Sequence, residues 1–300
     1  MLKPVDNATR RTRLADTGVI RVQGADAVKF LQGQVSNDVA RLAADVSVLA
    51  GLHNPQGRVI ALLRLVLAGP DEILALVPRE LAAPVATRLS KFVLRAKVKI
   101  ADVSGEWDVT AVTGGPAGVP EHGLWVGVGP SRWLVLTPTG TPGPIEATET
   151  LDASEWRALD IAAGIPQVYA ATSETFVAQM LNLDLVDGIS FDKGCYTGQE
   201  VIARAHYRGK VKRRMQRFRT LGVAKLSPGD AGTLGDGRSF KVVDAVQLSD
   251  GRCEFLAVTT FAAGDDDAAE APAAAGTPAP ALANTPIATE QLPLPYALPA

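Results

Sequence analysis

Residues 192–200, DKGCYTGQE, contain the side chains best suited to chemistry in this sequence. Cys195 is one of only two cysteines among the 300 residues, and it closely follows Lys193. Thr197 and Glu200 match the capping-box pattern, which predicts a helix N-cap at Thr197 and a helix along GQEVIARAH. Cys195 would then lie two residues before the N-cap, where the helix dipole and the nearby ammonium both favour a thiolate. The segment predicts either a reactive thiol or an inert, buried cysteine beside a capped helix start.

The other potential metal ligands are scattered along the chain. His53, His122 and His206 lack the spacing typical of zinc or iron–sulfur sites. Cys253 lies in the middle of a predicted strand, where core packing explains it. No second ligand stands near Cys195 in the sequence, so we expect no metal site formed by this chain alone.

A run of basic residues follows the cysteine segment. Glu200 and Arg204 are spaced for a favourable i,i+4 pair on the predicted helix. The run contains no acid, although the whole chain carries a net charge of −2. Three interpretations stay open: a solvated strand or domain seam, a site for an anionic ligand or partner, and an RNA-binding surface. The run comprises Arg204, Arg208, Lys210, Lys212, Arg213, Arg214, Arg217 and Arg219.

Short apolar strands and a few helices must position these segments. The sequence predicts a hairpin around residues 69–71, a helix over residues 80–95, and a further helix from an N-cap at Ser154 to a stop at Gly164. In the last third, two Asp-Gly pairs predict tight turns in a small β-barrel or sandwich. Residues 263–289 are too poor in large apolar side chains to fold, which predicts a disordered linker. These patterns together predict an α+β protein.

The sequence shows no targeting or membrane signal. The N-terminal residues lack the apolar stretch of a signal peptide. The longest apolar run, residues 59–68, is too short for a membrane span and contains Arg64. We expect a soluble, cytoplasmic protein without a membrane partner, in a reducing compartment.

Four stretches resemble the YgfZ-type folate-binding proteins and the related mitochondrial iron–sulfur assembly factors, in the superfamily of the glycine-cleavage T-protein. They are FLQGQVSNDV at 30–39, WRALDIAAGIP at 156–166, the long segment at 180–214, and LPLPY at 292–296. The long segment contains KGCYTGQE, which is the most specific part of the match.

The resemblance implies a three-domain T-protein-like fold with a central folate cavity and a C-terminal β-barrel. Residues 1–150 would form the N-terminal folate-binding region and residues 151–210 a middle helical segment. Residues 211–262 would form the barrel, completed by residues 290–298 after the 263–289 linker. The resemblance further implies tetrahydrofolate or a derivative as cofactor, and iron–sulfur client proteins such as radical tRNA-modifying enzymes as partners.

The resemblance also assigns candidate site residues. Cys195 would be the functional thiol, as a redox-active group or a transient cluster ligand, supported by Lys193, Gly194, Tyr196, Gln199 and Glu200. The candidate folate contacts are Trp156, Asn182, Arg204 and Arg208. Core packing is the alternative role for Trp156.

Departures from the family pattern limit the chemistry. Ala61 and Leu62 stand where the T-protein aminomethyltransferases carry acids, and an aliphatic side chain cannot handle a proton, so aminomethyl transfer is disfavoured. Thr17 and Ala162 replace a family aromatic and a glutamate, which weakens the expected folate contacts. We predict a folate-binding accessory factor, without classical turnover, for the assembly, maintenance or repair of iron–sulfur proteins, including enzymes of tRNA modification. The alternatives are a tetrahydrofolate-dependent one-carbon transferase and a tRNA-binding module.

Overall fold

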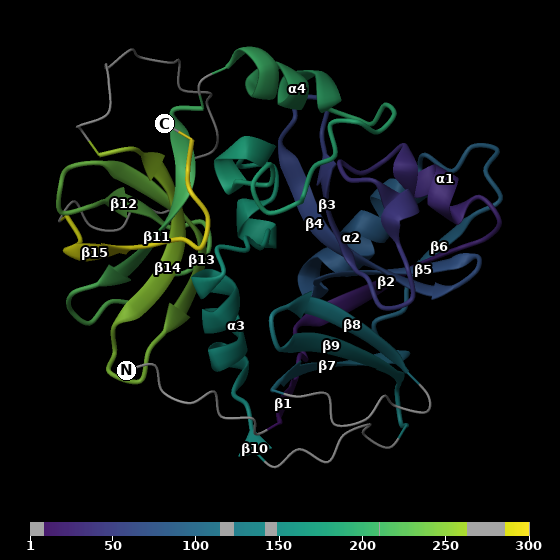
Figure 1. Cartoon of the computed structure of the whole chain (residues 1–300), viewed down its shortest axis with the longest axis horizontal. Coiled ribbons are helices and arrows are strands. Elements are labelled where there is room, and N and C mark those ends of the chain that lie inside the picture. The colour runs from purple at the N-terminus through teal and green to yellow at the C-terminus, as the bar shows by residue number, and fades with distance from the viewer. Residues whose placement is uncertain (1–8, 115–122, 142–148, 210, 263–285, 300) are drawn as a thin grey trace. The chain divides into compact units, whose positions relative to one another are not determined.

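The computed structural model in Figure 1 describes residues 9–114, 123–141, 149–209, 211–262 and 286–299. Lys210, His122 and most of the predicted linker lie outside these residues. The chain divides into two compact units. The N-terminal unit comprises Met1–Leu52, Ala61–Trp156 and Ile189–Tyr196, and the C-terminal unit comprises His53–Ile60, Arg157–Gly188 and Thr197–Ala300.

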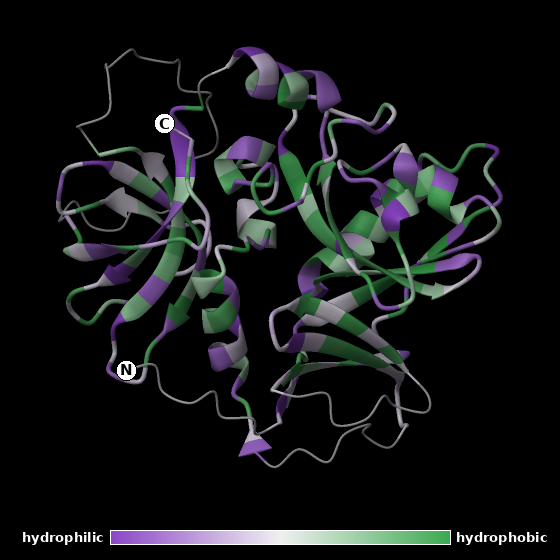
Figure 2. Ribbon diagram, in the orientation of Figure 1, coloured by the Kyte–Doolittle hydropathy of each residue, from purple (hydrophilic) through white to green (hydrophobic). Residues whose placement is uncertain are grey.

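The first sheet of the N-terminal unit has the strand order β3-β4-β5-β2-β6. Its strands are β2 (Thr17–Gln23), β3 (Val48–His53), β4 (Val59–Gly69), β5 (Glu72–Pro78) and β6 (Lys99–Asp102). The predicted hairpin is confirmed as the antiparallel pair β4–β5. Consecutive residues of β4 are buried, so both faces of this strand are covered, and Figure 2 shows the strand as a mainly apolar stretch.

Three helices accompany this sheet, α1 (Ala27–Gln32), the short η1 (Val39–Arg41) and α2 (Arg79–Ser90). Leu81, Val85 and Leu89 of α2 are buried, as their helical spacing predicts. The predicted helix over residues 80–95 is too long, because α2 ends at Ser90. The Ser90 hydroxyl donates to the Ala86 carbonyl at 2.8 Å, and the next three amides bond to carbonyls three residues back, which tightens the helix into a turn.

The second sheet of the N-terminal unit has the order β10-β1-β7-β9-β8. A shared apolar core joins the two sheets, with Val66 and Leu74 from the first, and Val109 and Leu134 from the second. Trp156 belongs to the same core. The strands are β1 (Arg10–Arg13), β7 (Trp107–Thr113), β8 (Leu124–Gly129), β9 (Arg132–Pro138) and β10 (Glu149–Thr150).

Helix α3 (Ala153–Ala162) contains the division between the units, after Trp156. The predicted N-cap at Ser154 is wrong, because Asp152 caps the helix. The Asp152 carboxylate accepts the Ser154 amide at 2.8 Å, and the Glu155 carboxylate accepts the Asp152 amide at 2.9 Å. These bonds form a capping box that places Ser154 inside the first turn, and they lower the pKa of both carboxyl groups.

The C-terminal unit contains a five-stranded sheet of order β12-β13-β14-β11-β15. Its core includes Phe218, Phe240, Phe255 and the fully buried Cys253, so the core role predicted for Cys253 is confirmed. The strands are β11 (Arg213–Thr220), β12 (Ala231–Thr233), β13 (Ser239–Gln247), β14 (Cys253–Thr260) and β15 (Thr289–Leu292). The unit also contains the short helices η2 (Ala170–Thr172) and η3 (Ala178–Leu181), and α4 (Gln199–Arg208).

The pairing of this sheet contains a crossover, and the ladders of the described residues do not show the closure of the predicted β-barrel. β14 and β15 flank β11 and both run antiparallel to it, so they are parallel to each other. Thr260 pairs with Arg213 at one end of β11, whereas Thr289 pairs with Thr220 at the other. The strands at the two edges of the sheet are β12 and β15. Among the described residues, the isolated bridge Leu234–Ile287 lies next to them, and no ladder pairs them.

Across the described residues, no helix combines the length and apolar character needed to cross a membrane.

Candidate functional site

Lys193 is held by the loop that follows α1. Its Nζ donates to the carbonyl oxygens of Gln32 at 2.7 Å, Val35 at 2.6 Å and Asn37 at 3.0 Å. An ammonium group has three hydrogen-bond donors, so these three carbonyls use all of them. Residues 30–39 and the segment around Lys193 are far apart in sequence. The hydrogen bonds of Lys193 join them inside the N-terminal unit.

The carbonyls converge because side chains fix the loop from within. The Asn37 amide donates to the Leu49 carbonyl at 2.8 Å, and the Ser36 hydroxyl accepts the Gly51 amide at 2.8 Å. The Ser190 amide also donates to the Ser36 carbonyl at 2.9 Å, which draws the cysteine segment onto the loop. We call the carbonyls of Gln32, Val35 and Asn37 the lysine cradle.

Burial lowers the pKa of Lys193 to about 8, and the negative charge of Asp38 opposes this shift. The side chain therefore remains mainly an ammonium at neutral pH. Its Nζ lies 5.1 Å from the centre of the Tyr196 ring, a cation–π contact. Burial raises the pKa of Tyr196 to about 12, so the phenol is neutral.

Cys195 is exposed between these two anchored residues. A Cβ on Gly194 would meet no atom beyond its chain neighbours within 4 Å, so the backbone next to Cys195 borders open space. Cys253 differs in every respect, because it is fully buried and burial raises the pKa of its thiol. Of the two cysteines, Cys195 alone is placed for reaction with a dissolved molecule or a partner.

The start of α4 differs from the predicted capping box. The N-cap is Gly198, with a φ of +82°, and no side chain caps the helix. A Cβ on Gly198 would lie 2.5 Å from the Asn54 carbonyl oxygen, so glycine permits the close approach of the 54–57 turn in the C-terminal unit. Thr197 therefore lies outside the helix, and Glu200 contributes only a favourable charge in its first turn.

Most of the charged side chains of α4 are exposed to solvent. Glu200, Arg204 and Arg208 are exposed, whereas Gln199 is half-buried. The expected pairing of Glu200 with Arg204 is absent from the ion pairs of the described residues. The exposed arginines leave α4 with a basic outer surface.

Two of the candidate folate-binding side chains are buried and already in contact with other protein groups. Trp156 is 6% exposed in the apolar core, and the Arg132 guanidinium lies 4.1 Å from the centre of its ring. Asn182 is fully buried; its amide donates to the Met215 carbonyl at 2.9 Å, and its Oδ1 accepts from Arg214 at 3.3 Å. Both side chains have structural roles in the described conformation.

The basic run is largely neutralised where it enters β11. Arg214 is 4% exposed and forms two bonds to Asp184, from Nη1 at 3.0 Å and from Nη2 at 2.9 Å. Arg217 and Arg219 both bind the buried Glu254, at 2.8 Å and 3.1 Å. Arg214 is therefore part of the interior of the C-terminal unit, whereas Arg217 and Arg219 are partly exposed and bound to a buried acid.

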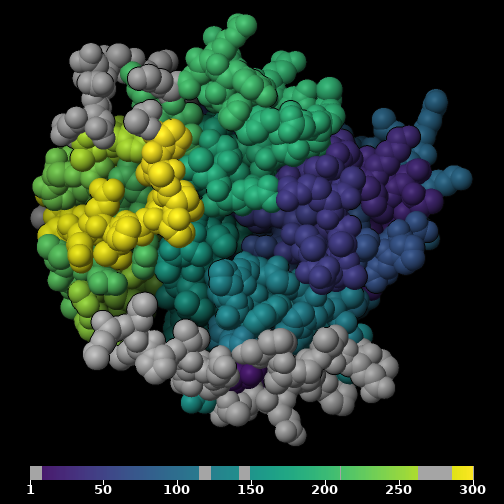
Figure 3. All heavy atoms as spheres, viewed as in Figure 1, coloured from purple at the N-terminus to yellow at the C-terminus, as the bar shows by residue number. Residues whose placement is uncertain are grey.

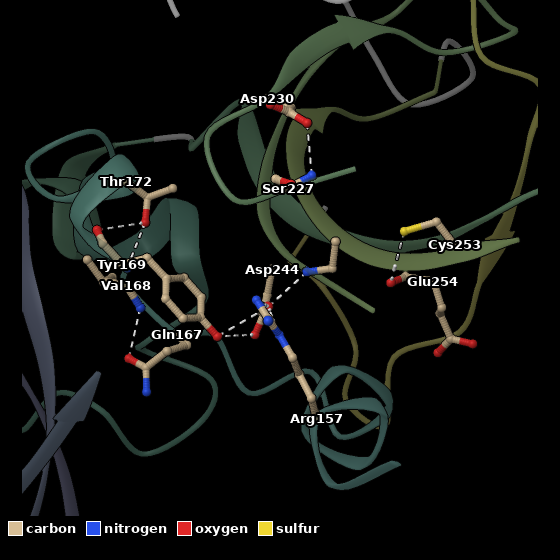
Figure 4. Close-up of polar contacts among 11 residues, drawn as sticks. Arg157, Gln167, Val168, Tyr169, Thr172, Ser227, Asp230, Asp244, Cys253 and Glu254 are labelled. Carbon is tan, nitrogen blue, oxygen red and sulfur yellow. Dashed lines mark hydrogen bonds and ion pairs between the residues drawn. The ribbon is translucent and has the colours of Figure 1, made fainter. Parts of the chain in front are cut away.

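A further ion pair, between a buried carboxylate and a partly exposed arginine, lies between α3 and β13 (Figure 4). Arg157 forms an ion pair with Asp244, and the Tyr169 hydroxyl donates to the same carboxylate at 3.2 Å. Burial raises the pKa of Asp244 to about 6, and the Arg157 charge opposes that rise. Burial also raises the pKa of Tyr169.

The closing LPLPY segment packs against the end of α3. The Tyr296 hydroxyl donates to the Gly164 carbonyl at 2.7 Å and accepts from the Asn182 amide at 3.4 Å. A Cβ on Gly164, whose φ is +64°, would lie 2.6 Å from the Tyr296 hydroxyl oxygen. Three stretches that carry the family resemblance therefore meet inside the C-terminal unit.

The sequence did not reveal the lysine cradle. Its acceptors are backbone carbonyls, and their residue types do not mark them as partners of a lysine. The only signal was that both stretches belong to the same resemblance. Among the described residues, no group of three or more His, Cys, Asp or Glu side chains is placed to hold a metal ion.

Known proteins resemble this chain over most of its length. No family model matches it. An uncharacterized protein from Haemophilus influenzae is 35% identical over 202 residues, which cover 67% of this chain and 70% of that protein. The proteins named tRNA-modifying protein YgfZ from Yersinia pseudotuberculosis and from Escherichia coli K12 are 35% and 33% identical. These matches cover 79% and 80% of this chain, and 80% and 82% of the relatives.

The fold is also similar to that of a solved structure. The glycine cleavage system aminomethyltransferase T from Bartonella henselae matches with a TM-score of 0.65 at 14% identity. The match covers 84% of this chain and 78% of that protein, and it shows the shared fold. From the extent and identity of the sequence matches, this chain belongs to the family of the tRNA-modifying protein YgfZ.

Proposed function

We propose that this chain is a folate-binding accessory factor in tRNA modification, and that it serves the assembly, maintenance or repair of iron–sulfur enzymes. The relatives' name, tRNA-modifying protein, and the fold shared with aminomethyltransferase T support this proposal. The observation that carries it is the exposed thiol of Cys195 on a segment anchored by Lys193 and Tyr196. Cys195 acts as a redox-active group or a transient ligand of a cluster.

The anchoring explains how this chain would present the thiol. Lys193 and Tyr196 restrict the backbone on both sides of Cys195, whereas Gly194 leaves the approach open. A partner could therefore meet the sulfur without first ordering a loop, which lowers the entropic cost of the encounter. Lys193 acts through position, because its donors already bind the lysine cradle.

The candidate folate contacts fit a folate unequally. Arg204 and Arg208 are exposed and could pair with the carboxylates of a glutamate tail. Trp156 and Asn182 are buried and engaged by Arg132, Met215 and Arg214. We therefore propose that folate binding depends chiefly on the arginines of α4.

The alternative, a tetrahydrofolate-dependent one-carbon transferase, has less support. Ala61 is fully buried and Leu62 is 1% exposed, both in β4, where aminomethyltransferases would need an acid. An acid at either position would be buried in an apolar strand at a large desolvation cost. Turnover of methylene-tetrahydrofolate with a purified acceptor would nevertheless revive this alternative.

Complementation tests the thiol. In a deletion strain, we expect wild type and Cys253→Ala to restore the activity of an iron–sulfur tRNA-modifying enzyme, and Cys195→Ala to fail despite normal folding. Restoration by Cys195→Ala would contradict the proposed role. Cys195→Ser separates the chemistry of sulfur from the size of the side chain.

Titration with tetrahydrofolate, followed by tryptophan fluorescence, tests the cofactor. We expect Arg204→Gln with Arg208→Gln to weaken binding more than Trp156→Phe does. A flat titration of the wild type would remove folate from the proposal. It would leave the thiol experiment independent and still informative.

A further inference from the structure

A basic segment at residues 91–99 follows α2 in the N-terminal unit. After the tight turn at the end of α2, the backbone bends through residues 94–97 and enters the edge strand β6. Lys91, Arg95, Lys97 and Lys99 are all exposed. In Figure 3, blue atoms from this part of the chain extend from the surface next to the purple atoms of α1.

The cations of this segment form no ion pair with an acid in the described part of the chain. Residues 91–99 contain no acid. Within the described part of the chain, the side chains of the four cations form no hydrogen bond or ion pair. The adjacent Asp26 carboxylate accepts the Lys97 backbone amide at 2.7 Å, which fixes the loop, and among the described residues it forms no ion pair with the Lys97 ammonium.

Exposed apolar side chains lie among these cations. Leu94 is 88% exposed, Phe92 is 48% exposed, and Val28 on the neighbouring α1 is 37% exposed. Lysines on an edge strand often prevent strand-to-strand aggregation, and this explains Lys99. It does not explain a nearly fully exposed leucine and a half-exposed phenylalanine, because these favour association.

We propose that residues 91–99 form a binding surface for single-stranded RNA, in which the cations contact phosphates and Phe92 stacks on a base. A positively charged track with an aromatic side chain is the usual composition of such surfaces. Cys195 is not one of the residues of this surface, so the proposal does not depend on a thiol function or on folate.

The composition favours RNA over an acidic protein or a membrane. Three of the four cations are lysines, which bind phosphates well as point charges but are depleted in protein–protein interfaces. Membrane-surface binding normally uses an amphipathic helix with a continuous apolar face, whereas this segment is a bent loop. The other basic region is a weaker candidate, since Arg214, Arg217 and Arg219 are engaged by acids.

Fluorescence anisotropy with a labelled oligouridine RNA tests the surface in the full chain. If four phosphates are contacted, the logarithm of the association constant should fall with the logarithm of salt concentration with a slope of about −3. Lys91→Gln with Lys97→Gln should reduce that slope by about 1.4. Phe92→Ala should weaken binding about tenfold, while Phe92→Tyr keeps it.

A matched control removes the same charge elsewhere. Lys225→Gln with Lys241→Gln lowers the net charge equally on the C-terminal unit and should leave the affinity and the slope unchanged. Circular dichroism confirms that each variant is folded. No binding by the wild type, or equal effects of the two double variants, would overturn the proposal.

Competition distinguishes the chemical class of the partner. Unlabelled oligouridine should displace the probe, whereas polyglutamate and phosphatidylserine vesicles at the same charge concentration should not. Equal competition by polyglutamate would overturn the RNA assignment in favour of an acidic protein surface. Equal competition by vesicles would overturn it in favour of a membrane.

Discussion

Two basic segments have opposite surroundings in this protein. On β11 of the C-terminal unit, Arg214, Arg217 and Arg219 are bound by Asp184 and Glu254. The 91–99 segment of the N-terminal unit contains no acid, and its cations have no side-chain partner among the described residues. A local excess of basic residues is therefore compatible either with an ion-pair network inside the fold or with an open cationic surface.

The difference lies in the geometry of the partner strand. Glu254 on β14 stands directly opposite Arg219 in the antiparallel register, and Arg217 lies diagonally across from it. Residues 91–99 form a bent loop and the start of an edge strand, which have no such neighbour on their outer side. A central strand brings acids from distant sequence to its basic residues, whereas an edge does not.

Removal of Asp184 should have the largest effect. The Asp184→Ala variant leaves the Arg214 guanidinium buried without its carboxylate, and we expect a loss of about 3–5 kcal/mol in the free energy of unfolding. Urea denaturation measures it. The double variant Asp184→Leu with Arg214→Met should recover most of the loss. A loss below about 1 kcal/mol would mean that this pair behaves like an exposed one.

The pH dependence of Asp244 should have the second largest effect. Its pKa is about 6 when folded, above the usual 3.8, so between these values the folded state binds a proton that the unfolded chain does not. The contribution of Asp244 to the free energy of unfolding therefore rises as pH falls through 6, by at most about 3 kcal/mol.

Unfolding of the wild type and of Asp244→Asn, compared between pH 7 and pH 4, isolates this contribution. As the pH falls, the free energy of unfolding of the wild type should rise relative to that of Asp244→Asn. In Arg157→Gln the transition should move to higher pH, because the opposing cation is gone. A difference that stays constant with pH would show that the pair keeps its charges throughout.

Neutralisation of Glu254 should have a smaller effect. In Glu254→Gln, Arg217 and Arg219 lose a shared carboxylate, but their side chains are 17% and 30% exposed and can reach water. We expect a loss of about 1–2 kcal/mol, measured by chemical denaturation. Glu290→Gln on the adjacent β15 is the control, because its side chain is exposed. Equal losses in the two variants would argue against a buried network.

Neutralisation of the open segment should have the smallest effect on stability. Lys91→Gln with Lys97→Gln should change the free energy of unfolding by less than about 0.5 kcal/mol, because no side-chain partner is lost. A thermal melt beside the wild type measures this. A clear destabilisation would show that these cations are part of the folded interior, as on β11.

The sequence allowed prediction of features that depend on local patterns. The β4–β5 hairpin, the buried face of α2 and the core position of Cys253 follow from periodicity and from turn residues. Local patterns failed where two competing groups suit the same role. Asp152 replaced Ser154 as a cap, and Gly198 began α4 because the 54–57 turn needs close contact.

The candidate site was predictable only in part, because local sequence patterns do not show which distant residues come into contact. The exposed cysteine segment could be identified from its residue types and from the family resemblance. The lysine cradle could not, because backbone carbonyls carry no signature in the sequence. The burial of Trp156 and Asn182 depends on Arg132 and Arg214, which approach from distant strands.

The placement of β15 sets a minimum size for the chain segment between residues 260 and 289. Because β14 and β15 are parallel on opposite sides of β11, the connection must return along the length of that strand. At about 3.3 Å per residue, the return from the Arg213 end to the Thr220 end spans about 23 Å. Because a connection between parallel strands must also cross the intervening strand, engineered versions of the protein should keep about a dozen residues or more in this segment. They cannot replace it with a hairpin turn, since the last strand would then point the wrong way.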